Sequence, residues 1–304
     1  MKLGIIGGSG QLGSTTAFLA GVRGLFSEIK LADINKNLLK SHVLDMNQAL
    51  TAESNTRVSL AEYADLAGCD ILLLTAALPE RSVSSRNDYL KGNVEIVQGV
   101  CDSLKKYCDE KIFITATNPI DICNYKAYSF LKWNRNKFIG FCSNDTLRLK
   151  WAISNLLKVG FDRVEALCIG EHGEGQIPLF DRVFVDGAQK VLSPGQIAGV
   201  KELIGNWFAD YQKLQSGRSP GWTSAAGLAV ILRALVEGSE KPLPCSAILD
   251  GEFNERGLSI GVPCRLGKNG IEEIVQIELR DRDEKKFRET ADKIRMLLGG
   301  AGGP

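Results

Sequence analysis

The sequence begins with a glycine-rich segment that directly follows a short apolar run. Residues 4–13 read GIIGGSGQLG, so that Gly8, Gly10 and Gly13 form a G-x-G-x-x-G pattern. Gly8 permits a tight turn, Gly10 lets the backbone approach a phosphate group, and Gly13 lets the next helix pack against the strand. The first turn of that helix offers backbone N–H groups and a partial positive charge. The segment therefore predicts a phosphate-binding strand–turn–helix.

A carboxylate follows at the distance that dinucleotide-binding folds require. Asp33 ends the next strand-like segment, 20 residues after Gly13. A carboxylate there can accept hydrogen bonds from both hydroxyls of a ribose and repels a 2′-phosphate, which favours NAD over NADP. Two alternatives stay open: Lys36 keeps NADP possible, and Asp33 could instead be the N-cap of a helix that begins near Asn35.

The order of strands and helices predicts an α/β fold with two domains. Strand-like segments alternate with amphipathic helices up to residue 142, at residues 2–7, 28–33, 70–76, 111–116 and 137–142. This alternation is typical of a Rossmann-type, doubly wound parallel sheet, with ligands at the carboxyl ends of the strands. We therefore expect a dinucleotide-binding domain at 1–142 and a substrate and catalytic domain at 143–304.

The second half has a different, α+β pattern with antiparallel strands. Asp186-Gly187 is a turn pair that favours a hairpin. The expected strands are 164–170, 182–185, 189–192, 247–249, 258–262 and 274–279, and the expected helices are 145–157, 194–214, 223–236 and 283–298. Residues 267–270, Gly-Lys-Asn-Gly, are expected to form a turn between two of the strands.

Composition excludes several classes of protein. Lys and Arg number 37 against 36 Asp and Glu, a net charge of +1, which does not favour a nucleic-acid or membrane partner bound through bulk charge. The apolar stretch 71–78 is too short to span a bilayer, and the N-terminus enters a strand pattern, not a signal peptide. The eight cysteines form no C-x-x-C pair, which argues against a zinc site or a disulfide framework. We expect a cytoplasmic protein without a metal.

Only two histidines are present, so an imidazole acid or base has two candidates. His172 lies in Gly-Glu-His-Gly directly after an expected strand, where a turn would expose it to a cleft. His42 lies on an amphipathic helix, where a surface or packing role is the simpler interpretation. A backbone-satisfied turn residue is the alternative for His172.

Charged and polar residues near other strand ends complete a candidate site. Asp145 and Arg148 share one helix face, so that the carboxylate could orient an imidazole and the guanidinium could bind a substrate carboxylate at two points. The alternative is an N-cap Asp beside a solvated Arg. Arg86, in a polar loop, could close over a substrate, and Asn118 follows the strand at 111–116.

At this point the chain resembles the lactate/malate dehydrogenase family along nearly its whole length. The segments that carry the resemblance include GIIG at 4–7, TNP at 117–119, GEHG at 170–173, GLSIGVP at 257–263 and GKNG at 267–270. The resemblance implies that NAD binds at Gly8, Gly10, Gln11, Leu12, Gly13, Asp33, Thr75, Ala76, Ala77, Asn93, Thr117 and Asn118. Ala77 replaces the glycine that is usual beside the cofactor.

The resemblance also implies the chemistry. His172 would exchange the proton, Asp145 would pair with it, Arg148 would clamp the carboxylate of a small anionic 2-oxo or 2-hydroxy acid, Arg86 would polarise the carbonyl, and Thr223 and Asn118 would line the pocket. Family members form homodimers or homotetramers, so we expect an oligomer.

The position that discriminates substrates in the family falls on Glu80. A carboxylate there would repel a second substrate carboxylate and favour a lactate-type over a malate-type substrate, whereas a shift of one residue would place Arg81 there and reverse the preference. We therefore expect a lactate-like NAD-dependent L-2-hydroxy-acid dehydrogenase, with malate dehydrogenase as the first alternative. A non-catalytic dinucleotide sensor on the same fold is the alternative of another class.

Overall fold

One continuous sheet runs through the computed structural model, which describes residues 1–78, 86–216 and 220–300. Its strands lie in the order β3-β2-β1-β4-β5-β6-β12-β13-β8-β9, and β14 pairs with β13. The strands β1 to β6 are all parallel. Their order, 3-2-1-4-5-6, is that of a doubly wound dinucleotide-binding sheet, so the predicted fold class is confirmed. These strands are Lys2–Ile6, Glu28–Ala32, Arg57–Leu60, Ile71–Leu74, Ile112–Thr115 and Phe138–Gly140.

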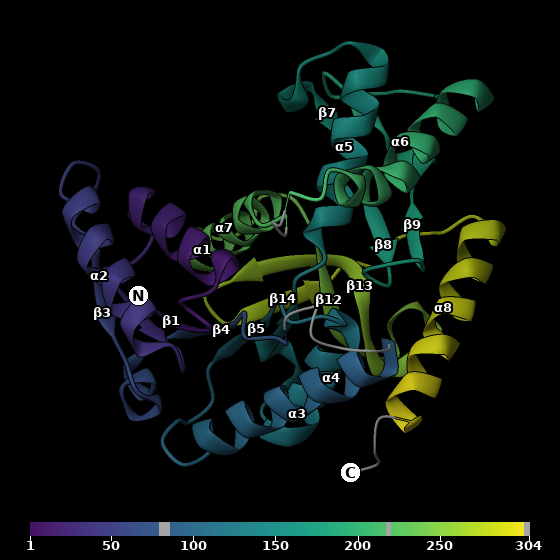
Figure 1. Ribbon diagram of the computed structural model, residues 1–304. Helices are drawn as coiled ribbons and strands as arrows, with labels where there is room; N and C mark the ends of the chain where they lie inside the picture. The colour runs from purple at the N-terminus through teal and green to yellow at the C-terminus, as the bar shows by residue number, and fades with distance from the viewer. Residues whose placement is uncertain (79–85, 217–219, 301–304) are drawn as a thin grey trace.

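The parallel strands are apolar on both sides because helices cover both faces of the sheet. All four residues of β4 are fully buried. Ile71 and Leu73 belong to one hydrophobic cluster, whereas Leu72 and Leu74 belong to another. Side chains of a strand alternate between faces, so these two clusters are the two covered faces. In Figure 1, α1 and α7 lie above the sheet, and α3 and α4 lie below it.

The helices agree with the expected order, with small shifts of their ends. Asn35 precedes α2 and accepts a hydrogen bond from the Leu38 N–H, so the N-cap is Asn35 and the alternative role for Asp33 is wrong. Arg86 was expected in a loop but begins α3. The helices are α1 Gln11–Val22, α2 Lys36–Leu50, α3 Arg86–Leu104, α4 Ile120–Leu131, α5 Ser143–Leu157, α6 Pro194–Lys213, α7 Trp222–Glu237 and α8 Asp281–Gly300.

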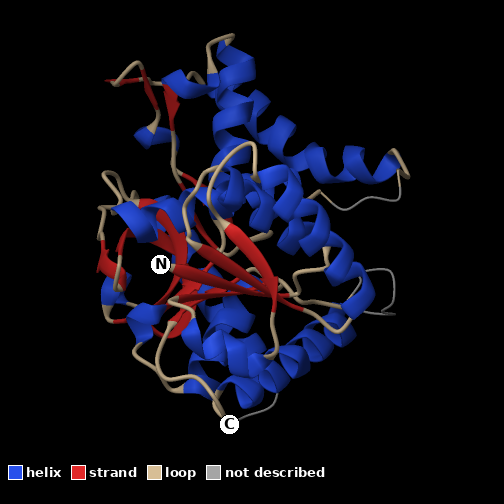
Figure 2. Ribbon diagram, turned by 90° about the vertical axis from the view of Figure 1, so that its left-hand side faces the viewer, coloured by secondary structure: helices blue, strands red, loops and turns tan. Residues whose placement is uncertain are grey.

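The second half extends the same sheet with antiparallel strands. The long strands β12 (Leu243–Asp250) and β13 (Arg256–Gly267) pair with one another, β12 adjoins β6, and β13 adjoins β8 (Cys168–Gly170). Seen from the side in Figure 2, the strands form a fan between layers of helices. The turn expected at 267–270 joins β13 to β14 (Gly270–Ile274). The third antiparallel strand therefore begins earlier than expected, and residues 275–279 do not continue it.

The expected strand at 164–170 is two strands in different sheets. Residues Val164–Glu165 form β7 in a small sheet with β10 (Phe184–Val185) and β11 (Ala188–Gln189), whereas β8 joins the main sheet. The hairpin of β10 and β11 turns at Asp186 and Gly187, which have φ values of 53° and 75°, as the turn pair predicted. Two short edge strands, β3 and β9 (Gln176–Pro178), were not expected.

The glycine-rich turn packs too closely for a side chain at one of its positions. A Cβ atom at Gly13 would lie 2.3 Å from the Gly7 carbonyl oxygen and 2.9 Å from Thr75 Oγ1. The first turn of α1 therefore rests on the end of β1. A methyl group at this position would push the two elements apart.

We expect Gly13→Ala to lower the free energy of unfolding by about 1–3 kcal/mol, because the clash is with backbone atoms. Urea unfolding followed by circular dichroism measures this change. Gly99→Ala is the matched control, since nothing lies within 4 Å of a Cβ there in α3, and it should raise stability by up to about 1 kcal/mol. Equal stability of both variants would contradict the close packing.

Candidate functional site

The ends of β1, β2 and β4 meet at one edge of the sheet and hold the glycine-rich turn. Gly7 and Gly8 donate their N–H groups to the Ala32 carbonyl at 2.9 and 3.1 Å, and Thr75 Oγ1 donates to the Gly7 carbonyl at 3.1 Å. Gly10 is the N-cap of α1, with no side chain capping the helix and no acidic residue in its first turn. Gln11 begins the helix, and Leu12 packs on the core. The positive end of α1 therefore faces a glycine cradle suited to a pyrophosphate.

Asp33 lies beside this turn with an ionised carboxylate. Its two oxygens accept hydrogen bonds from the Ser9 N–H at 2.9 Å and the Asn35 N–H at 3.0 Å. Burial favours the neutral acid, but these N–H groups outweigh it and hold the pKa of Asp33 below its ordinary value. An oriented, negatively charged acceptor therefore stands at the place where a ribose would bind.

Two basic residues of α2 are already engaged near Asp33. Lys36 Nζ pairs with Glu62 Oε1 at 2.5 Å, and His42 Nε2 lies 3.2 Å from the Ser9 carbonyl oxygen. Because a carbonyl only accepts, Nε2 is the donor in that contact. His42 therefore binds the glycine-rich turn, a contact that the helix pattern of the sequence did not indicate.

On the nicotinamide side of the expected site, buried side chains hydrogen-bond the backbone of the segments that follow β4 and β5. Fully buried Asn93 accepts from the Leu78 N–H at 2.8 Å and donates to the Asn118 carbonyl at 2.7 Å. Buried Thr117 donates to the Ala76 carbonyl at 2.8 Å. Ala77, between these points, is exposed. Asn93 and Thr117 thus hold the segments after β4 and β5 together and leave Ala77 facing outward.

His172 and Asp145 form a hydrogen-bonded pair. His172 follows β8, Asp145 lies in the first turn of α5, and Nδ1 is 2.8 Å from Asp145 Oδ2. Only 14% of the His172 side chain and 6% of the Asp145 side chain are exposed. Cys142 is the N-cap of α5, so the alternative that Asp145 merely caps its helix is wrong. Because Nδ1 is engaged, Nε2 is the ring nitrogen left for proton exchange.

Asp145 makes the imidazole a stronger base. Burial disfavours the protonated ring, but the charge and the hydrogen bond of Asp145 outweigh it and raise the pKa of His172 above its ordinary value. Arg148 opposes this effect. The imidazole can thus carry a proton near neutral pH.

A second carboxylate holds the backbone of the same histidine. Asp121, in the first turn of α4, accepts the His172 N–H at 2.9 Å. Its carboxyl group joins the start of α4 to the segment after β8, 51 residues away in sequence. The sequence contained Asp121 in the Thr-Asn-Pro-Ile-Asp segment, but no local signal pointed to this contact.

Arg148 is held in an aromatic contact and is not a solvated surface residue. Its guanidinium carbon lies 4.6 Å from the centre of the Trp207 ring, and Nη1 lies 3.7 Å from Asp145 Oδ1. Trp207 in turn stacks on Tyr211, with ring centres 5.4 Å apart. Burial lowers the pKa of Arg148, although Asp145 opposes this. Arg148 Nε is buried with no hydrogen-bond partner among the described residues.

Thr223 lies close to this group through the start of α7. Ser224 Oγ accepts from Asn144 Nδ2 at 2.7 Å, which ties the first turns of α5 and α7 together. Half-buried Thr223 precedes Ser224. The first turn of α7, which carries Thr223, therefore lies beside the first turn of α5, which carries Asp145.

Three expected site residues are not placed. Glu80 and Arg81 lie outside the described residues, and only the backbone of Arg86 is described. Their expected roles stay predictions.

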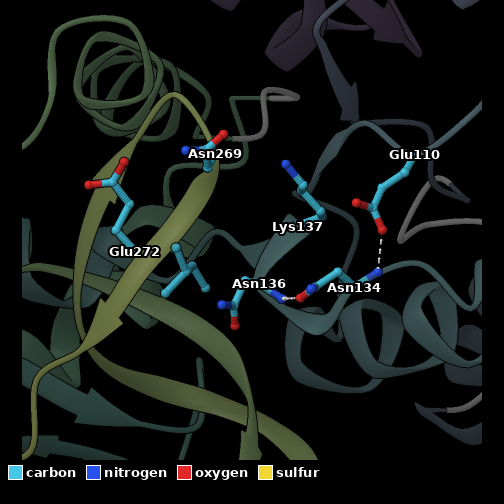
Figure 3. A pocket seen from close by; sticks show the side chains of 7 residues that line it. Glu110, Asn134, Asn136, Lys137, Asn269 and Glu272 are labelled. Carbon is cyan, nitrogen blue, oxygen red and sulfur yellow. Dashed lines mark hydrogen bonds between the residues drawn. The ribbon is translucent and has the colours of Figure 1, made fainter.

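A separate hollow lies between the segment before β6 and the β13–β14 hairpin (Figure 3). Three of its polar residues bind one another: Glu110 accepts from the Asn134 N–H, and the Asn134 side chain accepts from the Asn136 N–H at 3.0 Å. It contains none of the expected site residues. Its lining is Glu110, Asn134, Asn136, Lys137, Asn269, Ile271 and Glu272.

No group of three or more His, Cys, Asp or Glu side chains in residues 1–78, 86–216 and 220–300 could hold a metal ion. No helix in these ranges is long and apolar enough to cross a bilayer. All eight cysteines are buried, free thiols.

We expect Asp145→Asn to lower the pKa of His172 by about 1–2 units, because the imidazolium loses its nearest anion while burial still opposes the charge. Histidine-labelled protein followed by NMR through a pH titration measures this. Asp102→Asn, which removes an exposed carboxylate on α3, is the control. An unchanged pKa in Asp145→Asn would contradict the electrostatic coupling.

Comparison with known proteins finds relatives along nearly the whole chain. Residues 1–140 match the model of the lactate/malate dehydrogenase NAD-binding domain, and residues 212–298 match that of the family's alpha/beta C-terminal domain. Malate dehydrogenase of Natronomonas pharaonis is 32% identical over 297 residues, which cover 96% of this chain and 97% of that protein.

Solved structures show the same fold. Malate dehydrogenase of Cryptosporidium parvum superposes with a TM-score of 0.92 at 29% identity, covering 99% of this chain and 98% of that one. L-lactate dehydrogenase of Enterococcus mundtii has a TM-score of 0.93 at 22% identity, covering 100% and 99%, and shows the fold alone. NAD is the cofactor, and the protein is an NAD-dependent hydroxy-acid dehydrogenase. The chain belongs to the lactate/malate dehydrogenase family.

Proposed function

We propose that the protein interconverts a small L-2-hydroxy acid and the corresponding 2-oxo acid, with His172 as the proton donor and acceptor. The hydrogen bond of 2.8 Å between His172 Nδ1 and Asp145 carries this proposal. It fixes the ring and leaves Nε2 for the substrate oxygen.

His172 performs a simple proton transfer in each direction. During reduction, the protonated imidazole gives its Nε2 proton to the oxygen that becomes the hydroxyl group. During oxidation, the neutral imidazole takes that proton from the hydroxyl group. Asp145 accepts the Nδ1–H hydrogen bond and stabilises the imidazolium. Its charge and hydrogen bond raise the pKa of His172 and so favour the protonated form that reduction needs.

The edge of the sheet fits NAD. A Cβ at Gly13 would strike the Gly7 carbonyl, so α1 can pack on the end of β1 only with glycine there, and its positive end adjoins the turn. Asp33 would bind the ribose, and the segments held by Asn93 and Thr117 would lie beside the nicotinamide. NAD supplies the hydride acceptor or donor when bound. The expected cofactor positions are Gly8, Gly10, Gln11, Leu12, Gly13, Asp33, Thr75, Ala76, Ala77, Asn93, Thr117 and Asn118.

NAD is preferred over NADP for two reasons. Asp33 is ionised and would repel a 2′-phosphate. Lys36, the cation that could have bound such a phosphate, already pairs with Glu62.

Arg148 is the proposed clamp for the substrate carboxylate. Its guanidinium is planar and can donate two parallel hydrogen bonds to a carboxylate. The guanidinium lies over the Trp207 ring and also contacts Asp145, so the orientation of Arg148 is restricted before substrate binds. Arg86 is the proposed group that polarises the substrate carbonyl, and Thr223 and Asn118 are the proposed pocket residues.

The relatives and the sequence favour different substrates. The relative from Natronomonas pharaonis and the Cryptosporidium parvum structure are both named malate dehydrogenase. We therefore place malate and oxaloacetate first. The second candidate pair is lactate and pyruvate, which Glu80 favours because a carboxylate beside the substrate would repel a second substrate carboxylate.

We also propose an oligomer, a homodimer or homotetramer. Large apolar side chains are exposed on α1, α2 and α7, of which α1 and α7 lie side by side (Figure 1). These side chains are Phe18, Leu38, Leu44 and Trp222. A cytoplasmic location agrees with eight free thiols. A boundary between dinucleotide and substrate domains at residues 142 and 143 is part of the same proposal.

An assay panel tests the function. We expect NADH oxidation with oxaloacetate, with pyruvate turned over more slowly, and weaker activity with NADPH. His172→Asn should lower kcat by about 10²–10⁴-fold, because a general acid contributes that much. Absorbance at 340 nm measures all of these rates, and light scattering gives the oligomeric state.

The outcomes separate the alternatives. Faster turnover of pyruvate than of oxaloacetate would make the protein lactate-type. Cofactor binding without turnover of any 2-oxo acid, unaffected by His172→Asn, would favour a dinucleotide sensor.

Trp207→Leu should raise the KM for the 2-oxo acid by about 3–10-fold and change kcat less, because a partly buried cation–π contact contributes about 0.5–2 kcal/mol to holding Arg148. Steady-state kinetics with NADH at saturation measures this split. Trp151→Leu, which changes an exposed tryptophan on α5, is the control and should keep the original KM. If KM stayed constant in Trp207→Leu, the ring would not position Arg148.

A further inference from the structure

A row of buried polar side chains lies behind His172, and the proposed proton transfer makes no use of it. It consists of Asp121 and Asn124 on α4, Ser246 on β12 and Ser259 on β13. None is more than 2% exposed. Buried polar groups cost free energy unless each finds a partner, so such a row calls for an explanation.

The hydrogen bonds in this row run in one direction. Asn124 Nδ2 lies 3.1 Å from the Ser246 carbonyl oxygen and 2.9 Å from Ser259 Oγ. A carbonyl can only accept, so the atom facing it must be the NH2 group, and its second proton goes to Ser259. Ser259 Oγ lies 2.7 Å from Ser246 Oγ and can donate its own proton there. Ser246 in turn donates to Asp121 Oδ1.

Asp121 is therefore an acceptor on both sides. Oδ1 receives the hydroxyl of Ser246, and Oδ2 receives the main-chain N–H of His172 at 2.9 Å. A protonated carboxyl group would carry an O–H that has to point toward one of these donors, and two donors cannot form a hydrogen bond with each other. An ionised carboxylate has only acceptor oxygens and fits both donors. The directed row of donors thus favours the anion.

Burial works against that charge. It raises the pKa of Asp121 to about 6, with Ser246 and the His172 N–H opposing the rise. Groups of both charges surround the two residues. Asp145 and Arg148 on α5 lie near His172, and Glu171 precedes it in sequence. The thiols of Cys123 and Cys142 lie near Asp121. Without its hydrogen-bond donors, this buried carboxyl group would be neutral over more of the pH range in which an imidazole titrates.

We propose that Asp121 is a positioning residue for His172: an ionised carboxylate that fixes the catalytic turn through the His172 main-chain N–H and favours the protonated imidazole. The row Asn124, Ser259 and Ser246 maintains this charge. The proposal rests on the proposed function in one respect, namely that His172 is the residue that transfers the proton. His172 would then lie between two carboxylates, Asp145 at its ring and Asp121 at its backbone.

Because the sequence contains only two histidines, the pKa of His172 can be measured directly, without an activity assay. Protein labelled with 15N and 13C in histidine gives two imidazole titration curves, one for His42 and one for His172. A His42→Gln sample assigns the signals. The protein is titrated from pH 5 to 9 without substrate, and the pKa of His172 is read from the chemical shifts.

We expect Asp121→Asn to lower the pKa of His172 by about 0.5–1 unit, since the imidazolium loses a nearby anion. The pH profile of 2-oxo-acid reduction should move to lower pH by the same amount, because reduction needs the protonated ring. Glu255→Gln is the matched control. Glu255 is also a buried carboxylate, it pairs with Arg295 on α8, and its neutralisation should leave the His172 titration in place.

Ser246→Ala provides a second, milder variant. It keeps the carboxylate but removes its hydroxyl donor, so the pKa of Asp121 should rise and that of His172 should fall by less than in Asp121→Asn. A His172 titration that moved in neither variant would overturn the proposal. So would unfolding of both variants, because the row would then serve the fold alone. A shifted titration in a protein that turned over no 2-oxo acid would support the proposal and refute the proposed function.

Discussion

Two close backbone approaches join the halves of this protein into one sheet. A Cβ at Gly140 would lie 2.6 Å from the Ser246 Cβ, and a Cβ at Gly261 would lie 2.5 Å from the Gly170 carbonyl oxygen. At these points β6 meets β12 and β13 meets β8, each through a single register pair. The turn that carries His172 begins directly after Gly170. The distance between the proposed base and the cofactor edge of the sheet thus depends on glycine at positions 140 and 261.

Electrostatics in the site are local, in a chain whose total charge is close to zero. Asp145 and Asp121 approach His172 from the first turns of α5 and α4, where the partial positive charge of a helix start favours carboxylates. Asp33 keeps its charge through two backbone N–H groups. Arg148 balances Asp145 and is covered by Trp207. Each of these charges therefore has specific partners close by. Because the dielectric constant between buried groups is low, a small change in their separation changes their interaction energy strongly.

Most of the elements could be predicted because their signals are local. Glycine spacing, the βαβ rhythm and the Asp186–Gly187 turn identified the fold class, most helices and one hairpin. The edge strands β3 and β9 were missed because they have three or four residues and little apolar alternation. The segment 164–170 was taken as one strand, since its apolar character continues although its ends pair with different sheets. Among site residues, His172, Asp145 and Arg148 were expected, whereas Asp121 and Trp207 were not, because their partners are distant in sequence.

The sequence by itself determined the dinucleotide-binding architecture, the family and the identity of the candidate acid and base, because these follow from residue types at fixed local spacing. Only the tertiary structure decided that His42 binds the glycine-rich turn, that Lys36 pairs with Glu62, and that Asp121 holds the backbone of His172. Those contacts arise where separate strands and helices end at one edge of the sheet. The physical reason is that hydrogen bonds and charges act through space, while a sequence pattern records only neighbours along the chain.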